Sequence, residues 1–144
     1  MKSVHSRVFL DTNPIIYLLD GIQPYAQKTL AFIKDCISCG GEFYTSTITD
    51  AEFLIKPFQK GDMNAVATYR EFLAQLDVLK VFINDEIAES AARIRCEYDG
   101  IKLADALQVA AAVSCGCDAF LTNDAQLRQI RGLDVLFLSE LQHR

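Results

Sequence analysis

Short apolar runs alternate with longer segments of helical periodicity along this chain. The runs are short enough for buried strands and are rich in Val, Phe, Tyr and Leu; they lie at residues 7–10, 42–45, 78–83, 118–121 and 135–137. Between them, apolar residues recur every three or four positions, as expected of helices, over residues 15–19, 25–39, 47–56, 64–75, 85–98 and 103–115. Strands that alternate with helices predict an α/β/α fold in three layers with a central parallel sheet.

Helix-stopping residues separate these elements. Asn13-Pro14 ends the first strand, and Pro14 suits the first turn of the following helix. Gly40-Gly41 ends the second helix, and the third should end at or before Pro57. The helix at 103–115 has so few polar residues that we expect it to be buried on most sides.

The length and charge of the chain limit the possible classes of protein. A chain of 144 residues without repeats or linkers fits a single domain over residues 1–144. Its net charge of −5 argues against a broad basic surface for nucleic acid, although bound cations and local basic clusters remain compatible with a nucleic-acid enzyme. No apolar run has membrane-spanning length, and the start lacks the signal-peptide pattern, so we expect a cytoplasmic protein without membrane contact.

The chain contains five cysteines, and this odd number indicates reduced thiols. Cys36 and Cys39, together with Cys115 and Cys117, offer four thiolates for a zinc ion. The spacing of the second pair is not that of a zinc knuckle, so small buried side chains are the favoured interpretation.

Four acidic residues should meet at one edge of the sheet. The carboxyl ends of parallel strands lie along the same edge, and the helices that follow them begin there. Asp11 closes the first strand and Asp124 follows the fourth, while Glu52 and Asp105 lie near the starts of two helices. Each acid also has a structural interpretation, as a helix cap, a partner of a helix dipole or a solvated residue.

A divalent cation explains this cluster economically. Asp105 lies on the most apolar helix, where an inward-facing acid needs a partner or a cation. Ligation by oxygen alone selects Mg²⁺ or Mn²⁺ over zinc. Thr12, Thr122 and Asn123 bring hydroxyl and amide groups to the same rim, where they can orient the carboxylates as a second shell or act as ordinary turn residues.

The motifs Leu10-Asp11-Thr12-Asn13, Ser46-x-x-Thr49-x-x-Glu52, Leu103-Ala104-Asp105-Ala106 and Leu121-Thr122-Asn123-Asp124 resemble those of PIN domains. Among these, the chain is most similar to the VapC-like ribonuclease toxins of toxin–antitoxin pairs. The resemblance implies an α/β/α fold and a Mg²⁺- or Mn²⁺-dependent endoribonuclease that acts on RNA. It also implies a homodimer and inhibition by an antitoxin. Carried over by position, the catalytic residues are Asp11, Glu52, Asp105 and Asp124; Asp11, Asp105 and Asp124 hold the metal.

Two other functions stay open from the sequence. A catalytically silent PIN-fold protein-binding module would use the same fold without turnover. Phosphatase chemistry with Asp11 as nucleophile ranks last, because Asn13 stands where that chemistry usually has a second acid. Asp50 and Asp99 are left unassigned, and the sequence does not show whether Gln108 contacts substrate.

Overall fold

The computed structural model describes residues 5–142. Their five strands form one sheet in the order β3-β2-β1-β4-β5, and every neighbouring pair is parallel. The strands are β1 (Arg7–Leu10), β2 (Glu42–Ser46), β3 (Leu79–Val81), β4 (Ala119–Thr122) and β5 (Asp134–Phe137). Within residues 5–142, no helix is both long and apolar enough to cross a bilayer.

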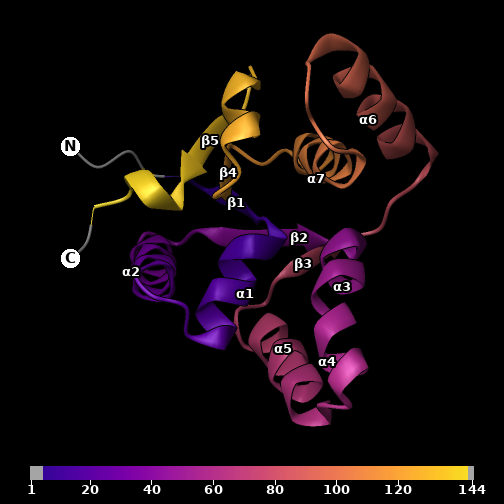
Figure 1. Cartoon of the computed structure of the whole chain (residues 1–144). Coiled ribbons are helices and arrows are strands. Elements are labelled where there is room, and N and C mark those ends of the chain that lie inside the picture. The colour runs from indigo at the N-terminus through magenta and orange to yellow at the C-terminus, as the bar shows by residue number, and fades with distance from the viewer. Residues whose placement is uncertain (1–4, 143–144) are drawn as a thin grey trace.

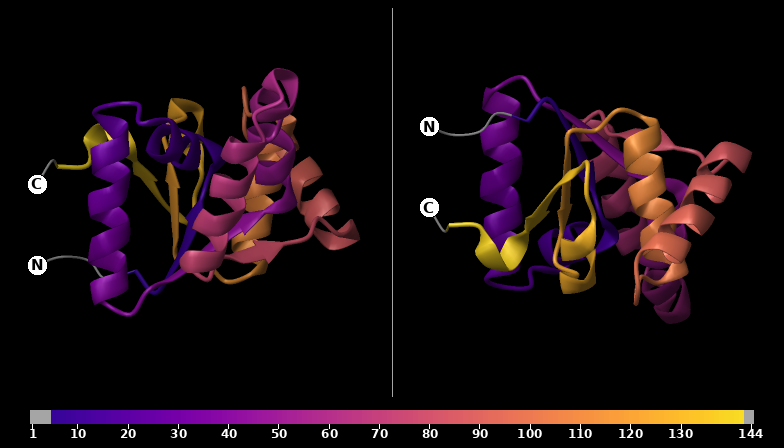
Figure 2. Two further views of the ribbon diagram at one scale, coloured as in Figure 1. Left: turned by 90° about the horizontal axis from the view of Figure 1, so that it is seen from below. Right: turned by 90° about the horizontal axis from the view of Figure 1, so that it is seen from above.

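Helices cover the sheet on both faces (Figure 1). The α-helices are α1 (Thr12–Asp20), α2 (Tyr25–Ser38), α3 (Thr47–Phe53), α4 (Ile55–Lys60), α5 (Met63–Gln75), α6 (Asp85–Glu97) and α7 (Leu103–Ser114). Two 3₁₀ turns, η1 (Ala125–Gln129) and η2 (Leu138–Glu140), flank β5. The pair α6–α7 lies on one side of the molecule and α2 on the other (Figure 2). The predicted α/β/α fold is confirmed.

Alternation along the central strands builds two separate cores. Successive side chains of a strand point to opposite faces of the sheet. Phe9 of β1 therefore packs on the α6–α7 side, where its ring stacks on Phe120 of β4 with 5.1 Å between centroids. Val8 and Leu10 pack on the other side, against α1, α2 and α5. Both faces of β1 and β4 are thus buried, as their nearly continuous apolar sequences predict.

The third strand is shorter than the apolar run at 78–83 predicts. β3 covers only Leu79–Val81 because it lies at the sheet edge and pairs with β2 alone, over Tyr44–Ser46. Leu79 is 56% exposed, so the apolar run is not a buried central strand. A second helix, α4, follows α3 directly and contains Pro57 in its first turn, where a proline breaks no intrahelical hydrogen bond.

Candidate functional site

The strand order reverses beside β1, and this point organises the site. From β1 the chain continues to β2 and β3 on one side, and later to β4 and β5 on the other. In such sheets the carboxyl ends of the two strands at the reversal leave a crevice where ligands bind. Asp11 directly follows β1, and Asp124 lies two residues after β4 ends at Thr122. The two carboxylates therefore flank the reversal point.

Asp11 is a buried carboxylate with both oxygens hydrogen-bonded. It is the N-cap of α1, where its Oδ1 accepts the backbone N–H of Thr12 at 2.9 Å. Its Oδ2 accepts the hydroxyl of Thr122 at 2.7 Å. The pKa of Asp11 is raised to about 6: burial raises it most, these two hydrogen bonds lower it, and the charges of Glu52 and Asp124 raise it. The capping role predicted as an alternative is therefore present alongside the clustering of acids.

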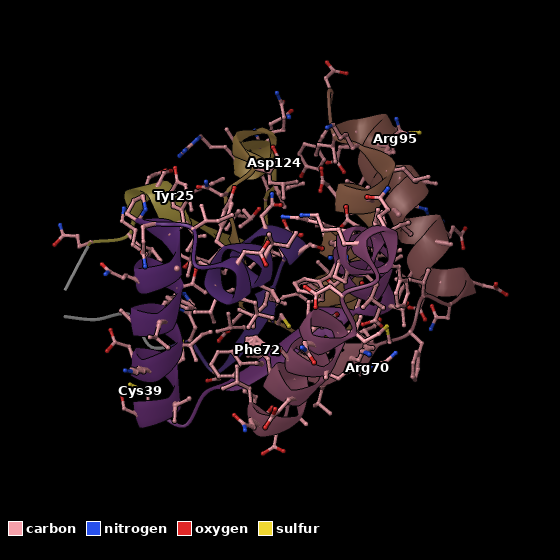
Figure 3. All side chains as sticks on the ribbon, turned by 60° about the horizontal axis from the view of Figure 1, so that its bottom comes forward. Tyr25, Cys39, Arg70, Phe72, Arg95 and Asp124 are labelled. Carbon is pink, nitrogen blue, oxygen red and sulfur yellow. The ribbon has the colours of Figure 1, made fainter. Side chains whose placement is uncertain are left out.

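Asp105 and Asp124 form a pair on the other side of Asp11. Asp105 lies in the first turn of α7, and its pKa is raised to about 7. Burial is the largest cause, followed by a hydrogen bond to Asp124 and the charges of Asp11, Asp124 and Glu52. Asp124, labelled in Figure 3, also caps η1, because its Oδ1 accepts the N–H of Gln126 at 3.0 Å. Asp124 thus contributes both to the cap of η1 and to the raised pKa of Asp105.

Glu52 approaches the cluster from α3. Glu52 is exposed to solvent, yet its Oε1 accepts a hydrogen bond from the hydroxyl of Thr12 at 2.7 Å. Since Thr12 directly follows Asp11, this bond holds Glu52 beside the first strand. The structure thus brings all four sequence-predicted acids to the same edge of the sheet.

Among the described residues, no basic side chain forms an ion pair with the four acids. None of the Lys, Arg or His ion pairs within residues 5–142 involves Asp11, Glu52, Asp105 or Asp124. An all-oxygen, negatively charged donor set fits a hard divalent cation in its chemistry. In the same range, however, no three His, Cys, Asp or Glu side chains are grouped closely enough to hold an ion. The geometry alone therefore assigns no metal centre, and the metal enters below as a proposal.

A buried polar network that sequence reasoning did not predict lies beneath the acids. Gln108 of α7 is fully buried, and its Nε2 donates to the hydroxyls of Thr49 at 2.7 Å and Thr12 at 3.3 Å. Its Oε1 accepts the hydroxyl of Ser46. Because Thr12 accepts from Gln108, its own proton is available for Glu52. The signal in the sequence was Gln108 itself, a single amide among the apolar residues that follow Asp105 on α7.

Of the other polar residues near the site, some contact the acids and others do not. Thr12 and Thr122 each bond a cluster carboxylate, as described above. Asn123 instead accepts the backbone N–H of Ser139 at 3.2 Å, and among the described residues no hydrogen bond joins it to the acids. Asp50 accepts the Tyr69 hydroxyl and pairs with Lys80 at 2.8 Å, which gives it a structural role.

The fold and the four acids define a class: an α/β protein with a carboxylate cluster at the switch point of a parallel sheet. A family model described as PIN domain matches residues 8–133. The chain therefore belongs to the PIN domain family. A search of curated proteins gives no match.

Solved structures of similar fold include a toxin–antitoxin complex from Klebsiella pneumoniae, which is 22% identical, with a TM-score of 0.64 over 91% of this chain and 97% of that chain. DNA-bound VapBC from Salmonella typhimurium is 20% identical, with a TM-score of 0.73 over 92% of this chain and 98% of that chain. VapBC-1 from nontypeable Haemophilus influenzae is 20% identical, with a TM-score of 0.71 over 93% and 99%. FitAcB from Neisseria gonorrhoeae is 21% identical, with a TM-score of 0.65 over 93% and 99%. At these identities the likeness establishes the fold.

Replacing Asp105 by Asn should stabilise the metal-free protein at pH 8. The pKa of Asp105 is about 7 in the folded state against 3.8 for a free side chain, so the folded state binds this proton more tightly. Stability therefore falls as pH rises from about 4 to 7, and Asp105→Asn removes this loss. We expect a gain on the order of 1 kcal/mol at pH 8, because Asp105 is only half-buried.

Chemical denaturation in chelator-containing buffer at pH 5 and pH 8 measures this gain. Asp99→Asn is the matched control, since Asp99 is exposed and outside the cluster. An equal effect of both substitutions at both pH values would contradict the like-charge interpretation.

Replacing Gln108 by Leu should destabilise the fold by about 2–3 kcal/mol, because it leaves buried hydroxyls without partners. Gln75→Leu, on the exposed face of α5, should change stability by less than about 0.5 kcal/mol. Adding Ser46→Ala to Gln108→Leu should cost less than the two separate effects combined, since both remove the same hydrogen bond. Full additivity, measured by denaturant titration, would show that the network is not coupled.

Proposed function

We propose that this protein is a metal-dependent endoribonuclease that hydrolyses RNA phosphodiester bonds, and that it is the toxin of a toxin–antitoxin pair. The observation that carries the proposal is the convergence of Asp11, Glu52, Asp105 and Asp124 without a basic partner. Membership of the PIN family and the toxin–antitoxin complex among its structural neighbours support the same function.

In this proposal, Asp11, Asp105 and Asp124 hold Mg²⁺ or Mn²⁺, and Glu52 completes the cluster. The cation supplies Lewis-acid stabilisation of the charge that builds on the phosphate during hydrolysis. Burial and the bonds from Thr12 and Thr122 hold the Asp11 carboxylate in one orientation. Those hydrogen bonds favour a fixed ligand over the nucleophile of the phosphatase alternative.

Other residues of the chain are available to position the substrate. A cleft of about 220 Å³ lies beside Glu52, and its lining includes Lys56 and Lys60. The same lining also contains the acids Asp20, Glu52 and Asp62, so the two ammonium groups are the local sites at which a phosphate of single-stranded or looped RNA would bind. No histidine base is needed: His5 bonds Asp134 instead, and His143 lies outside the described residues.

Asp11→Asn and Asp105→Asn should each lower the rate of RNA cleavage by about 100-fold or more, because each removes a cation ligand. The measurement is cleavage of a single-stranded RNA panel with Mg²⁺ or Mn²⁺, with chelator as the metal-free arm. Asp99→Asn should cleave like the wild type.

Two outcomes would overturn parts of this proposal. Cleavage by Asp11→Asn and Asp105→Asn at the wild-type rate would refute the site assignment. A wild-type protein that binds its partner but shows no metal-dependent turnover would instead be the silent binding module.

We also propose an antitoxin partner and a homodimer. A groove of about 450 Å³ between α1, α2 and α5 has an apolar lining that includes Leu18, Leu30 and Phe72. Phe72 is labelled in Figure 3, between α2 and α5. An exposed apolar groove of this kind is a surface that a partner protein covers.

Leu30→Asp should abolish either the complex with the antitoxin or the homodimer, because it places a charge in the apolar groove. The antitoxin to use is the small DNA-binding protein expected from the adjacent upstream reading frame. Light scattering after co-purification measures both assemblies. Phe82→Asp is the control, since Phe82 is 73% exposed in the loop between β3 and α6, away from the groove lining. Retention of both assemblies by Leu30→Asp would exclude the groove.

A further inference from the structure

A pair of thiols lies at the end of the sheet opposite to the acids. Cys115 and Cys117 flank Gly116 in the turn between α7 and β4, and their Sγ atoms are 3.5 Å apart. Gly116 has φ +74°, a backbone conformation that side-chain-bearing residues rarely adopt. The first turn of α7 carries Asp105, so this helix separates the dithiol from the acidic cluster.

The surroundings of the two thiols make them chemically unequal. The hydrogen bond between the two thiols lowers the pKa of Cys115, and the charge of Arg7 also lowers it, against the effect of burial. The same hydrogen bond raises the pKa of Cys117, as do burial and the charges of Cys115 and Asp118, while Arg7 opposes this shift. The thiolate is the nucleophilic form of cysteine, so Cys115 is the more reactive of the two.

Access and charge favour a small anionic reagent at this turn. Both thiols are partly exposed, and the Arg7 guanidinium lies over the turn, with its Nη1 donating to the carbonyl of Cys115 at 3.3 Å. Asp118, the nearby acid, is already engaged, because its carboxylate accepts the backbone N–H groups of Ser6 and Arg7. Arg7 Nε also lies 3.9 Å from Glu42 Oε2, but both side chains are more than half exposed, so solvent screens this pair and the guanidinium can still contact a carboxylate-bearing reagent.

We propose that Cys115 and Cys117 form a thiol–disulfide exchange site for low-molecular-weight disulfides of the glutathione type. The Cys115 thiolate attacks one sulfur of the reagent, whose S–S bond breaks and releases one thiolate. Cys117 then loses its proton and attacks the Cys115 sulfur of the mixed disulfide, releasing the second thiol. The protein dithiol is oxidised to a Cys115–Cys117 disulfide, and the reagent is reduced to two thiols.

The product should be readily reversible. The disulfide closes a loop with a single residue between the two cysteines, so loop closure contributes little to its stability. An excess of reduced thiol should therefore restore the dithiol.

The other cysteines provide internal comparisons. Cys36 is buried, and burial raises its pKa to about 11, which makes its thiol unreactive. Cys39 and Cys96 are exposed, so they show how far exposure makes a thiol of this chain reactive. Figure 3 shows Cys39 at the end of α2.

The experiment is exposure of the reduced, full-length protein to oxidised glutathione, followed by trapping of free thiols with N-ethylmaleimide and peptide mass mapping. We expect the peptide containing Cys115 and Cys117 to lose two hydrogens and escape alkylation, while Cys39 and Cys96 stay alkylated. Dithiothreitol should restore alkylation of both sites. Glutathione adducts on Cys39 or Cys96, with Cys115 and Cys117 still alkylated, would overturn the proposal.

Single variants test the order of the two steps. Cys117→Ser should retain one glutathione on Cys115, because no second thiol can release it. In Cys115→Ser, Cys117 should react at least about tenfold more slowly than Cys115 does in Cys117→Ser. Equal rates would refute the assignment of Cys115 as the attacking thiol. Cys39→Ser should oxidise like the wild type. If a variant fails to fold, the peptide map of the wild-type protein still tests the proposal.

Discussion

The hydrogen bond from Thr122 to Asp11 joins the two strands between which the sheet reverses its order. This bond stabilises the ionised carboxylate of Asp11, which burial alone disfavours. The backbone N–H of Thr12 donates a second hydrogen bond to the same carboxylate. Both donors come from backbone positions that the parallel pairing of β1 and β4 fixes, since Leu10 stands opposite Leu121 in the register. The remaining acids lie around this carboxylate, and the charges of Glu52 and Asp124 raise its pKa.

The helix α7 is the second element on which the site depends. Its small residues, among them Ala106 and Ala110, are buried and pack against both the sheet and α6. This close packing brings Asp105 to the crevice and places Gln108 beneath it. The amide of Gln108 then reaches β2, α3 and α1 at once, through Ser46, Thr49 and Thr12. One buried side chain thus ties together the three elements that surround the carboxylates.

Sequence reasoning predicted the elements that burial dictates and missed those that depend on three-dimensional partners. The apolar runs of β1 and β4 and the acids after them were predictable, because a parallel sheet places strand ends together. The hydroxyl of Thr12 as the partner of Glu52 was not, since a turn threonine looks the same in sequence whichever side chain it bonds. Likewise, the apolar run at 78–83 gave no sign that Leu79 lies on an exposed edge. The helix α4 was also missed. Pro57 is compatible with a helix because it falls in the first turn of α4, and its position in that turn depends on where α3 ends.

The charge of the chain bears on how the proposed activity would operate. A protein with net charge −5 and four carboxylates at one crevice repels a polyanion such as RNA at that crevice. Lys56 and Lys60 supply positive charge beside Glu52, but Lys56 is already 3.8 Å from Asp20 and so is partly neutralised. Attraction of a phosphate to the centre of the cluster therefore requires a cation there. Under the proposed function, cation and substrate should bind with positive coupling, because each reduces the electrostatic cost of the other.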